Sequence, residues 1–255
     1  IKKDLKKYKT YFIPVDSEHF SIWSLLDNNK KNNFEKIYIT ASGGPFRNLS
    51  LKKFRNISVK DALKHPNWSM GKKITIDSAT MMNKVFEIIE AKKIFNLNYK
   101  QLEILIHPKS YLHAIVKFNN GLSKLLVHDT NMKIPIFNSI YFNTDKKLKS
   151  KNINIKILNN LNLKKIDNIR FPVIKILNNL SNEDSLFETI IVSANDKLVK
   201  LFLNNKIKFT DISNTIIKIC NTPEFNKYKS MKPRNVEEIH NLSDYVSLKI
   251  SSMSV

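Results

Sequence analysis

Short apolar runs separated by turn-forming residues predict alternating strands and helices in the first part of the chain. Strands are predicted at residues 11–15, 36–40, 73–77, 103–106, 112–118 and 122–127. Apolar residues at helical spacing predict helices at 18–28, 58–64, 79–95 and 134–143. Asn119-Asn120-Gly121 between two apolar runs indicates a hairpin, so part of the sheet is expected to be antiparallel.

The pattern changes after residue 143. Residues 144–170 are rich in Lys and Asn and carry a short apolar alternation at 153–157, which predicts a connecting arm with one edge strand. Helices are predicted at 172–180, 184–204, 210–220 and 235–251, the third of them capped by Thr210 or Asp211. The expected fold is an α/β (α+β) domain with a mixed sheet at 1–143, the arm at 144–170, and a small all-α C-terminal domain at 171–255.

The net charge of +21 raises the question of nucleic-acid binding. The basic residues comprise 39 Lys but only 4 Arg, and Arg is the residue that forks onto phosphates and reads bases. Lys, Asn and Ile together make 104 of 255 residues, a bias that A/T-rich coding produces all along a chain. We therefore expect a solvated Lys-rich surface and no nucleic-acid partner.

Other features of the composition narrow the class of protein. No apolar run approaches the roughly 20 residues of a membrane span, so no membrane partner is expected. Cys220 is the one cysteine, which excludes an internal disulfide and favours a reducing compartment. The first residue is Ile, which indicates a processed product or part of a longer protein.

Candidate chemistry begins at Asp16-Ser17-Glu18, directly after the predicted strand 11–15. Side chains alternate on a strand, so Asp16 and Glu18 are expected to point to one side, at a strand end where ligands gather in open α/β sheets. The alternative is that Asp16 or Ser17 simply caps the helix that follows. The motif alone does not separate the two interpretations.

A second polar set lies on the predicted helix 79–95, which Ser78 is expected to cap. Asn83, Lys84 and Glu87 are three and four residues apart and so share one helix face. The ordinary interpretation is a solvated face, but a helix start with a Ser hydroxyl and a Lys is also a ready anion site. Together the two sets offer the carboxylates, amide and ammonium that a divalent cation and a phosphorylated substrate require.

Two loops add to this picture. Ser42-Gly43-Gly44 follows a predicted strand and uses two of the chain's four glycines, which favours backbone N–H groups approaching an anion; the alternative is an ordinary tight turn. The segment His65-Pro66-Asn67-Trp68-Ser69-Met70-Gly71 has the composition of a lid that shields chemistry from water. The alternative is a surface loop whose Trp68 packs inward.

These segments together resemble the 1-deoxy-D-xylulose 5-phosphate reductoisomerase family. The resemblance is carried, in family order and spacing, by Pro14-Val15-Asp16-Ser17-Glu18-His19, Ser42-Gly43-Gly44-Pro45-Phe46-Arg47, the segment 65–71, Asp77-Ser78-Ala79-Thr80-Met81-Met82-Asn83-Lys84 with Glu87, and Ile106-His107-Pro108. Weaker similarity continues through Met132-Lys133-Ile134-Pro135-Ile136, Phe171-Pro172 and Ala194-Asn195-Asp196.

The resemblance implies a role for each candidate. It implies that the ligands of Mg²⁺ or Mn²⁺ are Asp16, Glu18 and Glu87. It implies that the residues with catalytic roles are Glu18, Lys84 and Glu87. It implies that the phosphorylated sugar contacts Ser17, Glu18, Ser42, His65, Trp68, Met70, Ser78, Asn83, Lys84 and Glu87. It also implies that Gly71 contacts NADPH.

The family converts 1-deoxy-D-xylulose 5-phosphate to 2-C-methyl-D-erythritol 4-phosphate in the non-mevalonate route to isoprenoids, by rearrangement and then reduction with NADPH. Its members begin with an NADPH-binding domain, which this chain does not include. The resemblance therefore implies the C-terminal two-thirds of a homodimeric enzyme, inactive as this chain alone. The alternative is a non-catalytic remnant or binding module that retains the metal and phosphosugar site.

Some positions depart from the family pattern. Ala41 and Val85 stand where Gly is expected, and Val127-His128-Asp129-Thr130-Asn131-Met132 differs from a Gly- and Asp-bearing family loop, so the contact implied there is not carried over. The A/T-rich composition suggests the cytoplasm of a bacterium, for example a symbiont, with a plastid-type organelle as the alternative.

Overall fold

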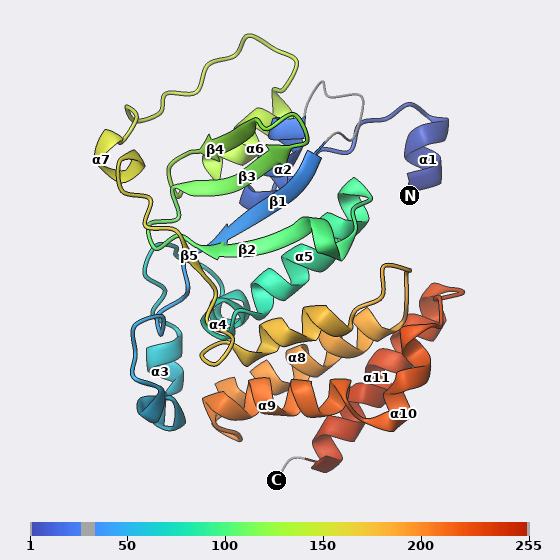
Figure 1. The fold of residues 1–255 in the computed structure, drawn as a ribbon. Helices are drawn as coiled ribbons and strands as arrows, with labels where there is room; N and C mark the ends of the chain where they lie inside the picture. The colour runs from blue at the N-terminus through green and yellow to red at the C-terminus, as the bar shows by residue number, and fades with distance from the viewer. Residues whose placement is uncertain (1, 27–33, 254–255) are drawn as a thin grey trace. The chain divides into compact units, whose positions relative to one another are not determined.

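The computed structural model describes residues 2–26 and 34–253 (Figure 1). The chain forms two compact units. Unit 1 comprises Ile1–Ala41 and Gln101–Leu163, and unit 2 comprises Ser42–Lys100 and Lys164–Val255. Residues 42–100 thus group with the C-terminal helices and not with their neighbours in the sequence. The predicted division into functional domains at 143 and 170 stays a prediction.

Unit 1 is built on a mixed sheet. Its strands are β1 (Phe34–Ala41), β2 (Leu102–Ile106), β3 (Leu112–Phe118) and β4 (Ser123–Val127), in the order β4-β3-β1-β2. The β1–β2 pair is parallel, whereas the β1–β3 and β3–β4 pairs are antiparallel. These strands, and the mixed sheet, confirm the prediction from the apolar runs.

The β3–β4 hairpin confirms the prediction made from Asn119-Asn120-Gly121. Gly121 has φ +86°, a conformation that L side chains rarely adopt, and its N–H donates to the carbonyl of Phe118 at 3.1 Å. The Phe118 N–H in turn donates to the carbonyl of Leu122 at 2.8 Å, which closes the turn.

Helices of unit 1 cover part of this sheet. The unit contains α1 (Lys2–Lys7), α2 (Ser17–Leu26), α6 (Lys133–Ile140) and α7 (Ile155–Leu158). Helix α2 packs on β1, β3 and β4, and α6 packs on α2. The predicted end of α2 at residue 28 lies outside the described residues.

Two strand predictions in or beside unit 1 are wrong. Residues 11–15 form no strand, and Tyr11, Phe12 and Val15 are exposed, because Pro14 has no N–H for a ladder and the segment pairs with no strand of the described chain. The apolar alternation at 153–157 belongs to the short helix α7, where the Asn154 side chain accepts from the N–H of Ile157 at 3.0 Å. The predicted arm does contain a strand, but it is the two-residue β5 (Lys164–Lys165) and not the alternation at 153–157.

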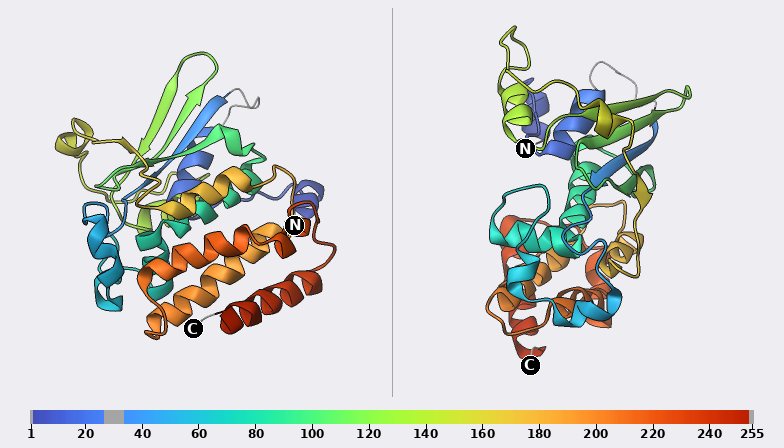
Figure 2. Two further views of the ribbon diagram at one scale, coloured as in Figure 1. Left: turned by 60° about the horizontal axis from the view of Figure 1, so that its bottom comes forward. Right: turned by 90° about the vertical axis from the view of Figure 1, so that its left-hand side faces the viewer.

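Unit 2 is helical. It contains 3₁₀ turns and helices named here in chain order: η1 (Leu51–Asn56), α3 (Val59–Ala62), α4 (Lys72–Thr80), α5 (Met82–Phe95), η3 (Pro172–Asn179), α8 (Phe187–Leu203), α9 (Phe209–Cys220), α10 (Pro223–Asn226), η4 (Lys227–Lys229) and α11 (Val236–Met253). A further turn, η2 (Tyr99–Gln101), precedes β2. Helix α8 packs against both α9 and α11, and Figure 2 shows the three running alongside one another. The all-α character predicted after residue 171 is confirmed.

The predicted strand at 73–77 is wrong. These residues lie in α4, which begins after Gly71, and the Thr75 hydroxyl donates to the Gly71 carbonyl at 2.8 Å. The prediction that Ser78 caps the following helix is also wrong, because Ser78 lies inside α4. The predicted helix 79–95 is interrupted at Met81, whose φ of 69° ends α4 and starts α5. The predicted cap of α9 also moves, since α9 begins after Lys208, whose N–H donates to the Asp211 carboxylate at 2.8 Å.

Among the helices that the structure describes, none combines the length and the apolar character that a membrane crossing requires.

Gly121→Ala tests the hairpin geometry. We expect the free energy of unfolding to fall by about 1–2 kcal/mol, because an L side chain is strained at positive φ. Chemical denaturation followed by circular dichroism measures the change. Gly121→Asn is the matched control and should lose less, since Asn tolerates this conformation. Equal stability of Gly121→Ala and the unsubstituted chain would contradict the assigned turn.

Candidate metal and phosphate site

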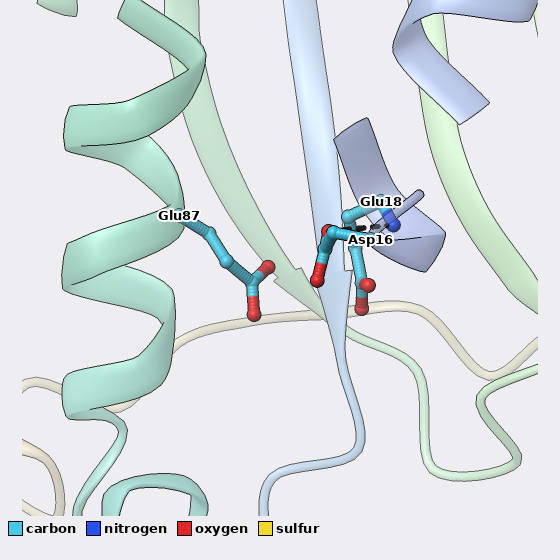
Figure 3. A group of neighbouring side chains, drawn as sticks. All are labelled: Asp16, Glu18 and Glu87. Carbon is cyan, nitrogen blue, oxygen red and sulfur yellow. Dashed lines mark hydrogen bonds between the residues drawn. The ribbon is translucent and has the colours of Figure 1, made fainter. Parts of the chain in front are cut away.

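Asp16 caps α2. Its Oδ1 accepts from the N–H of Glu18 at 3.0 Å (Figure 3). The same oxygen accepts from the N–H of His19 at 3.1 Å, and the Asp16 carbonyl accepts from the N–H of Phe20. The expectation that strand alternation aligns Asp16 with Glu18 is therefore wrong, and the capping alternative is correct for Asp16. A cap does not exclude ligand binding, because a carboxylate has two oxygens and about four lone-pair sites.

Ser17 and Glu18 form the first turn of α2. The buried Ser17 hydroxyl donates to the Glu18 carboxylate, which is half-buried. The ring of His19 is buried, with Nδ1 3.3 Å from Asp16 Oδ1. The first turn of one helix thus presents two carboxylates, held by the backbone and by a hydroxyl.

Further into unit 1, His113 is a packed, buried histidine. Its ring stacks on that of His128 with centroids 3.7 Å apart, and its Nε2 lies 3.3 Å from the His128 carbonyl. Burial lowers the pKa of His128, and the nearby Glu18 carboxylate opposes that shift. The stacked histidine pair therefore lies near Glu18. No motif in the sequence indicated this pair.

In unit 2, a histidine joins two predicted phosphate contacts. His65 Nε2 lies 3.2 Å from the hydroxyl of Ser42 and 3.1 Å from that of Ser78. The Ser42 hydroxyl also accepts from the N–H of Gly44 at 3.1 Å. The three side chains come from a loop, the predicted lid and α4, and the structure brings them into one hydrogen-bonded cluster.

Glycine is required at position 44 for this cluster to form. A Cβ there would lie 2.8 Å from the carbonyl oxygen of Ser78, closer than non-bonded atoms approach, and the φ of Gly44 is +62°. The backbone at Gly44 therefore packs directly on α4. The approach of backbone N–H groups to an anion stays a prediction, and the close approach that the structure shows is to a helix backbone.

The geometry fixes the protonation of His65. Nδ1 accepts from the N–H groups of Trp68 at 2.9 Å and Asn67 at 3.2 Å, so the proton of the neutral ring sits on Nε2. Burial, followed by the charges of Lys84 and Arg47, lowers the pKa of His65 to about 4. His65 is therefore neutral at pH 7 and donates from Nε2 toward the two hydroxyls.

The first turns of α5 carry the remaining predicted residues. The buried Lys84 Nζ lies 2.7 Å from Glu87 Oε2, and Asn83 Nδ2 donates to Glu87 Oε1 at 3.3 Å. Lys84 is 4% and Glu87 9% exposed, so the interpretation as a solvated face is wrong. Asn83 Oδ1 is buried without a hydrogen-bond partner in the described part of the chain, which leaves one acceptor for a ligand.

The predicted lid is an irregular loop tied to His65 through its backbone. Trp68 and Met70 are half-buried. Their exposure is thus intermediate between the two alternatives for this loop, an exposed lid and a loop whose Trp68 packs inward. Gly71 ends the loop as the residue that caps α4. The structure thus links the lid to the Ser42–Ser78 cluster by two hydrogen bonds to one ring.

Arg47 was not singled out by the sequence reasoning. Its Nη1 donates to the carbonyl of Ser42 at 3.2 Å, and its charge is one cause of the low pKa of His65. A signal existed, because Arg47 is one of only four arginines and lies in the Gly-Gly loop. With Lys84 it makes the surroundings of His65 electropositive, as an anion site requires.

Replacing Lys84 tests these electrostatics. Lys84→Met keeps most of the volume and removes the charge, so we expect the pKa of His65 to rise from about 4 toward its ordinary value of 6.5. The rise should be incomplete, because burial is the larger cause. An NMR titration of the His65 ring measures it, with Lys92→Met, on the same helix, as the control that leaves the pKa unchanged.

The same titration fixes the sign of the pH effect on stability. The pKa of His65 is lower in the folded than in the unfolded chain, so acid favours unfolding between pH 6.5 and about 4. An unchanged His65 pKa in Lys84→Met would contradict the assigned cluster.

Comparison with known families matches most of the chain. Residues 12–95 match a model described as "1-deoxy-D-xylulose 5-phosphate reductoisomerase C-terminal domain", and residues 128–247 match a model of "DXP reductoisomerase C-terminal domain". The first match contains both polar sets of the site.

Comparison with curated proteins points the same way. The chain is 96% identical over 255 residues to a 1-deoxy-D-xylulose 5-phosphate reductoisomerase of Pelagibacter ubique (strain HTCC1062), covering 100% of this chain and 66% of that relative. It is 39% identical over 225 residues to the same enzyme of Sulfurihydrogenibium sp. (strain YO3AOP1), covering 88% of this chain and 60% of the relative. The chain thus spans less than two thirds of the length of these relatives.

Solved structures share the fold. A crystal structure of DOX-P reductoisomerase in complex with NADPH, fosmidomycin and magnesium has a TM-score of 0.87 at 30% identity, over 98% of this chain and 65% of that one. The Zymomonas mobilis enzyme in complex with NADPH has a TM-score of 0.86 at 28% identity, over 98% and 64%. From the two family models and these relatives, the chain belongs to the 1-deoxy-D-xylulose 5-phosphate reductoisomerase family.

Proposed function

We propose that this chain is the metal- and substrate-binding part of an enzyme that converts 1-deoxy-D-xylulose 5-phosphate to 2-C-methyl-D-erythritol 4-phosphate with NADPH. The observation that carries the proposal is the hydrogen-bonded cluster of the buried Ser42 and Ser78 with the half-buried His65, near the charges of Lys84 and Arg47. Two hydroxyls, a neutral N–H donor and two cations suit a phosphate group. The family membership gives that phosphate a substrate.

The phosphate end is proposed to be held by Ser42, His65, Ser78, Asn83 and Lys84. A phosphate remote from the reacting carbons contributes binding energy for orientation of the substrate. His65 adds a link to the lid, because the ring that faces the phosphate site also accepts two N–H groups of the lid backbone. Trp68 and Met70 on that loop are proposed to exclude water from the bound substrate.

The reacting end is proposed to be held through a divalent cation bound by Asp16, Glu18 and Glu87. The donor types fit the ion, because all three residues are carboxylates and Mg²⁺ and Mn²⁺ prefer hard oxygen ligands. A solved relative at 30% identity was crystallised with magnesium. When bound, the cation supplies charge stabilisation to substrate oxygens as the carbon skeleton rearranges.

Helix α5 connects the two proposed ends. Lys84 and Glu87 are one turn apart, and their ion pair of 2.7 Å holds both side chains in place before any ligand binds. Glu87 would hold the cation, and Lys84 would donate to substrate oxygens beside it. NADPH, which solved relatives contain, supplies the hydride, and Gly71 is the proposed contact to it.

Finer features of the enzyme are proposals that rest on the family. They are the use of manganese beside magnesium, a homodimer, a place in the non-mevalonate route to isoprenoids, and a bacterial cytoplasmic location. A relative at 96% identity comes from the bacterium Pelagibacter ubique, which supports a bacterial source.

Glu87→Gln tests the metal assignment. We join the chain to the part of the Pelagibacter ubique relative that it does not span and follow NADPH oxidation with 1-deoxy-D-xylulose 5-phosphate and Mg²⁺. We expect kcat to fall by about 100-fold, the upper end of the losses for groups that only support a metal ligand. The cause is the replacement of a charged ligand by a neutral amide.

Glu90→Gln is the matched control, because Glu90 lies on the same helix and is exposed, and it should retain the rate. A Glu87→Gln protein with normal turnover and metal dependence would remove Glu87 from the site. No turnover by the unsubstituted joined protein, despite metal and phosphate binding, would favour a binding module.

A further inference from the structure

Helix α4 carries Ser78 on one side and is held on another by a buried polar contact with α8. Asn195 Nδ2 donates to Asp77 Oδ1 at 2.8 Å, across 118 residues of sequence. Asp77 is 3% and Asn195 0% exposed. The contact is internal to unit 2 and joins the helix of the phosphate site to the C-terminal helices.

A second, adjacent contact completes the attachment. Lys73 Nζ lies 3.0 Å from Asp77 Oδ2 and 2.9 Å from Asp196 Oδ1. Two consecutive residues of α8, Asn195 and Asp196, therefore hold two positions one turn apart on α4. Such a paired attachment fixes both the rotation of α4 about its axis and its position along α8.

The contact is directional rather than merely adhesive. A carboxylate only accepts, so Asn195 must present its amide nitrogen, and its Oδ1 is left buried without a hydrogen-bond partner among the described residues. Burial raises the pKa of Asp77, and the donors Asn195 and Lys73 oppose that shift. An apolar pair of this volume would avoid both costs, so the polar pair is better explained by the position it imposes.

Asp77 directly precedes Ser78, so any rotation of α4 moves the Ser78 hydroxyl relative to His65. The tolerance is small, because the backbone of Gly44 already packs on the Ser78 carbonyl. We propose that Asn195 and Asp77 are positioning residues for the phosphate end of the site, which they serve by holding Ser78 in register with His65. This inference rests on the proposed function, and no α8 residue touches the phosphate in it.

The test uses the 255-residue chain with inorganic phosphate as the probe. Asn195→Ala should raise the Kd for phosphate about tenfold, the low end of the losses seen when a supporting partner is removed. The double variant Asp77→Asn with Asn195→Asp exchanges donor and acceptor and should restore most of the affinity. Isothermal titration calorimetry measures the Kd of each variant.

Ser193→Ala is the matched control. Ser193 is also a buried residue of α8, but its hydroxyl bonds Ser243 of α11 at 2.9 Å and not α4. It should lower thermal stability and leave the Kd within about twofold of the unsubstituted value, well inside the loss expected when a supporting partner is removed. Equal affinities in Asn195→Ala and the unsubstituted chain would overturn the proposal, as would equal losses in Asn195→Ala and Ser193→Ala.

A ligand-free readout separates this inference from the proposed function. The ring ¹⁵N shifts of His65 report its hydrogen bond to Ser78 without any phosphate. A change in these shifts in Asn195→Ala that is absent in Ser193→Ala supports the positioning role, whether or not phosphate binds. Failure of phosphate to bind, or unchanged binding in Lys84→Ala, counts against the proposed phosphate site instead. An unchanged His65 spectrum in Asn195→Ala overturns the positioning role even where phosphate binds.

Discussion

The contact between the backbone of Gly44 and helix α4 is the constraint on which the phosphate end depends. With no Cβ at position 44, the loop approaches the Ser78 carbonyl at a distance that any other residue would block. This approach brings Ser42, at the start of the loop, to the same imidazole that Ser78 reaches from α4. One of the four glycines of the chain thus lies where a side chain cannot fit.

Helix α5 extends the arrangement from the phosphate end to the Glu87 carboxylate. The left-handed conformation of Met81 ends α4, so α5 can start in a new direction directly after the helix that carries Ser78. Lys84 and Glu87 then follow within two turns and are paired before ligands arrive. Burial, followed by the charges of Lys84 and Arg47, lowers the pKa of His65 and keeps its ring neutral, so the ring is a hydrogen-bond donor rather than a third charge.

Much of the fold follows from apolar periodicity. The strands β1 to β3 and the helices α8, α9 and α11 lie close to their predicted positions, because each buries apolar side chains. Strand β4 also lies where it was predicted, although none of its residues is fully buried. The predictions failed where a short apolar run had no regular face to bury. Residues 11–15 pair with no strand of the described chain. Residues 73–77 lie in a helix with buried residues, which the alternation of apolar and polar residues does not reveal.

The site was predictable in its residue types and only partly in its geometry. Resemblance to a family gave Ser42, His65 and Ser78 as substrate contacts, and the structure joins them in one hydrogen-bonded cluster. Two local predictions failed: Asp16 caps a helix instead of following a strand, and Ser78 lies inside a helix instead of capping one. Both depend on where a helix begins. The bond from Asn195 to Asp77 lay beyond reach, because it joins residues 118 apart.

The proposal with the widest consequences is that one divalent cation is bound by Asp16, Glu18 and Glu87, the ligands that the family resemblance implies. Titration of the ¹⁵N-labelled chain with Mn²⁺, followed by NMR, tests it most directly, because the ion broadens signals of nearby nuclei. If one ion binds all three carboxylates, the signals of the His19 backbone N–H, beside Glu18, and of the Asn83 side-chain amide, beside Glu87, broaden together. The broadening of both signals is then complete at one equivalent of Mn²⁺. Broadening of one signal without the other, or at different equivalents, would contradict a shared site.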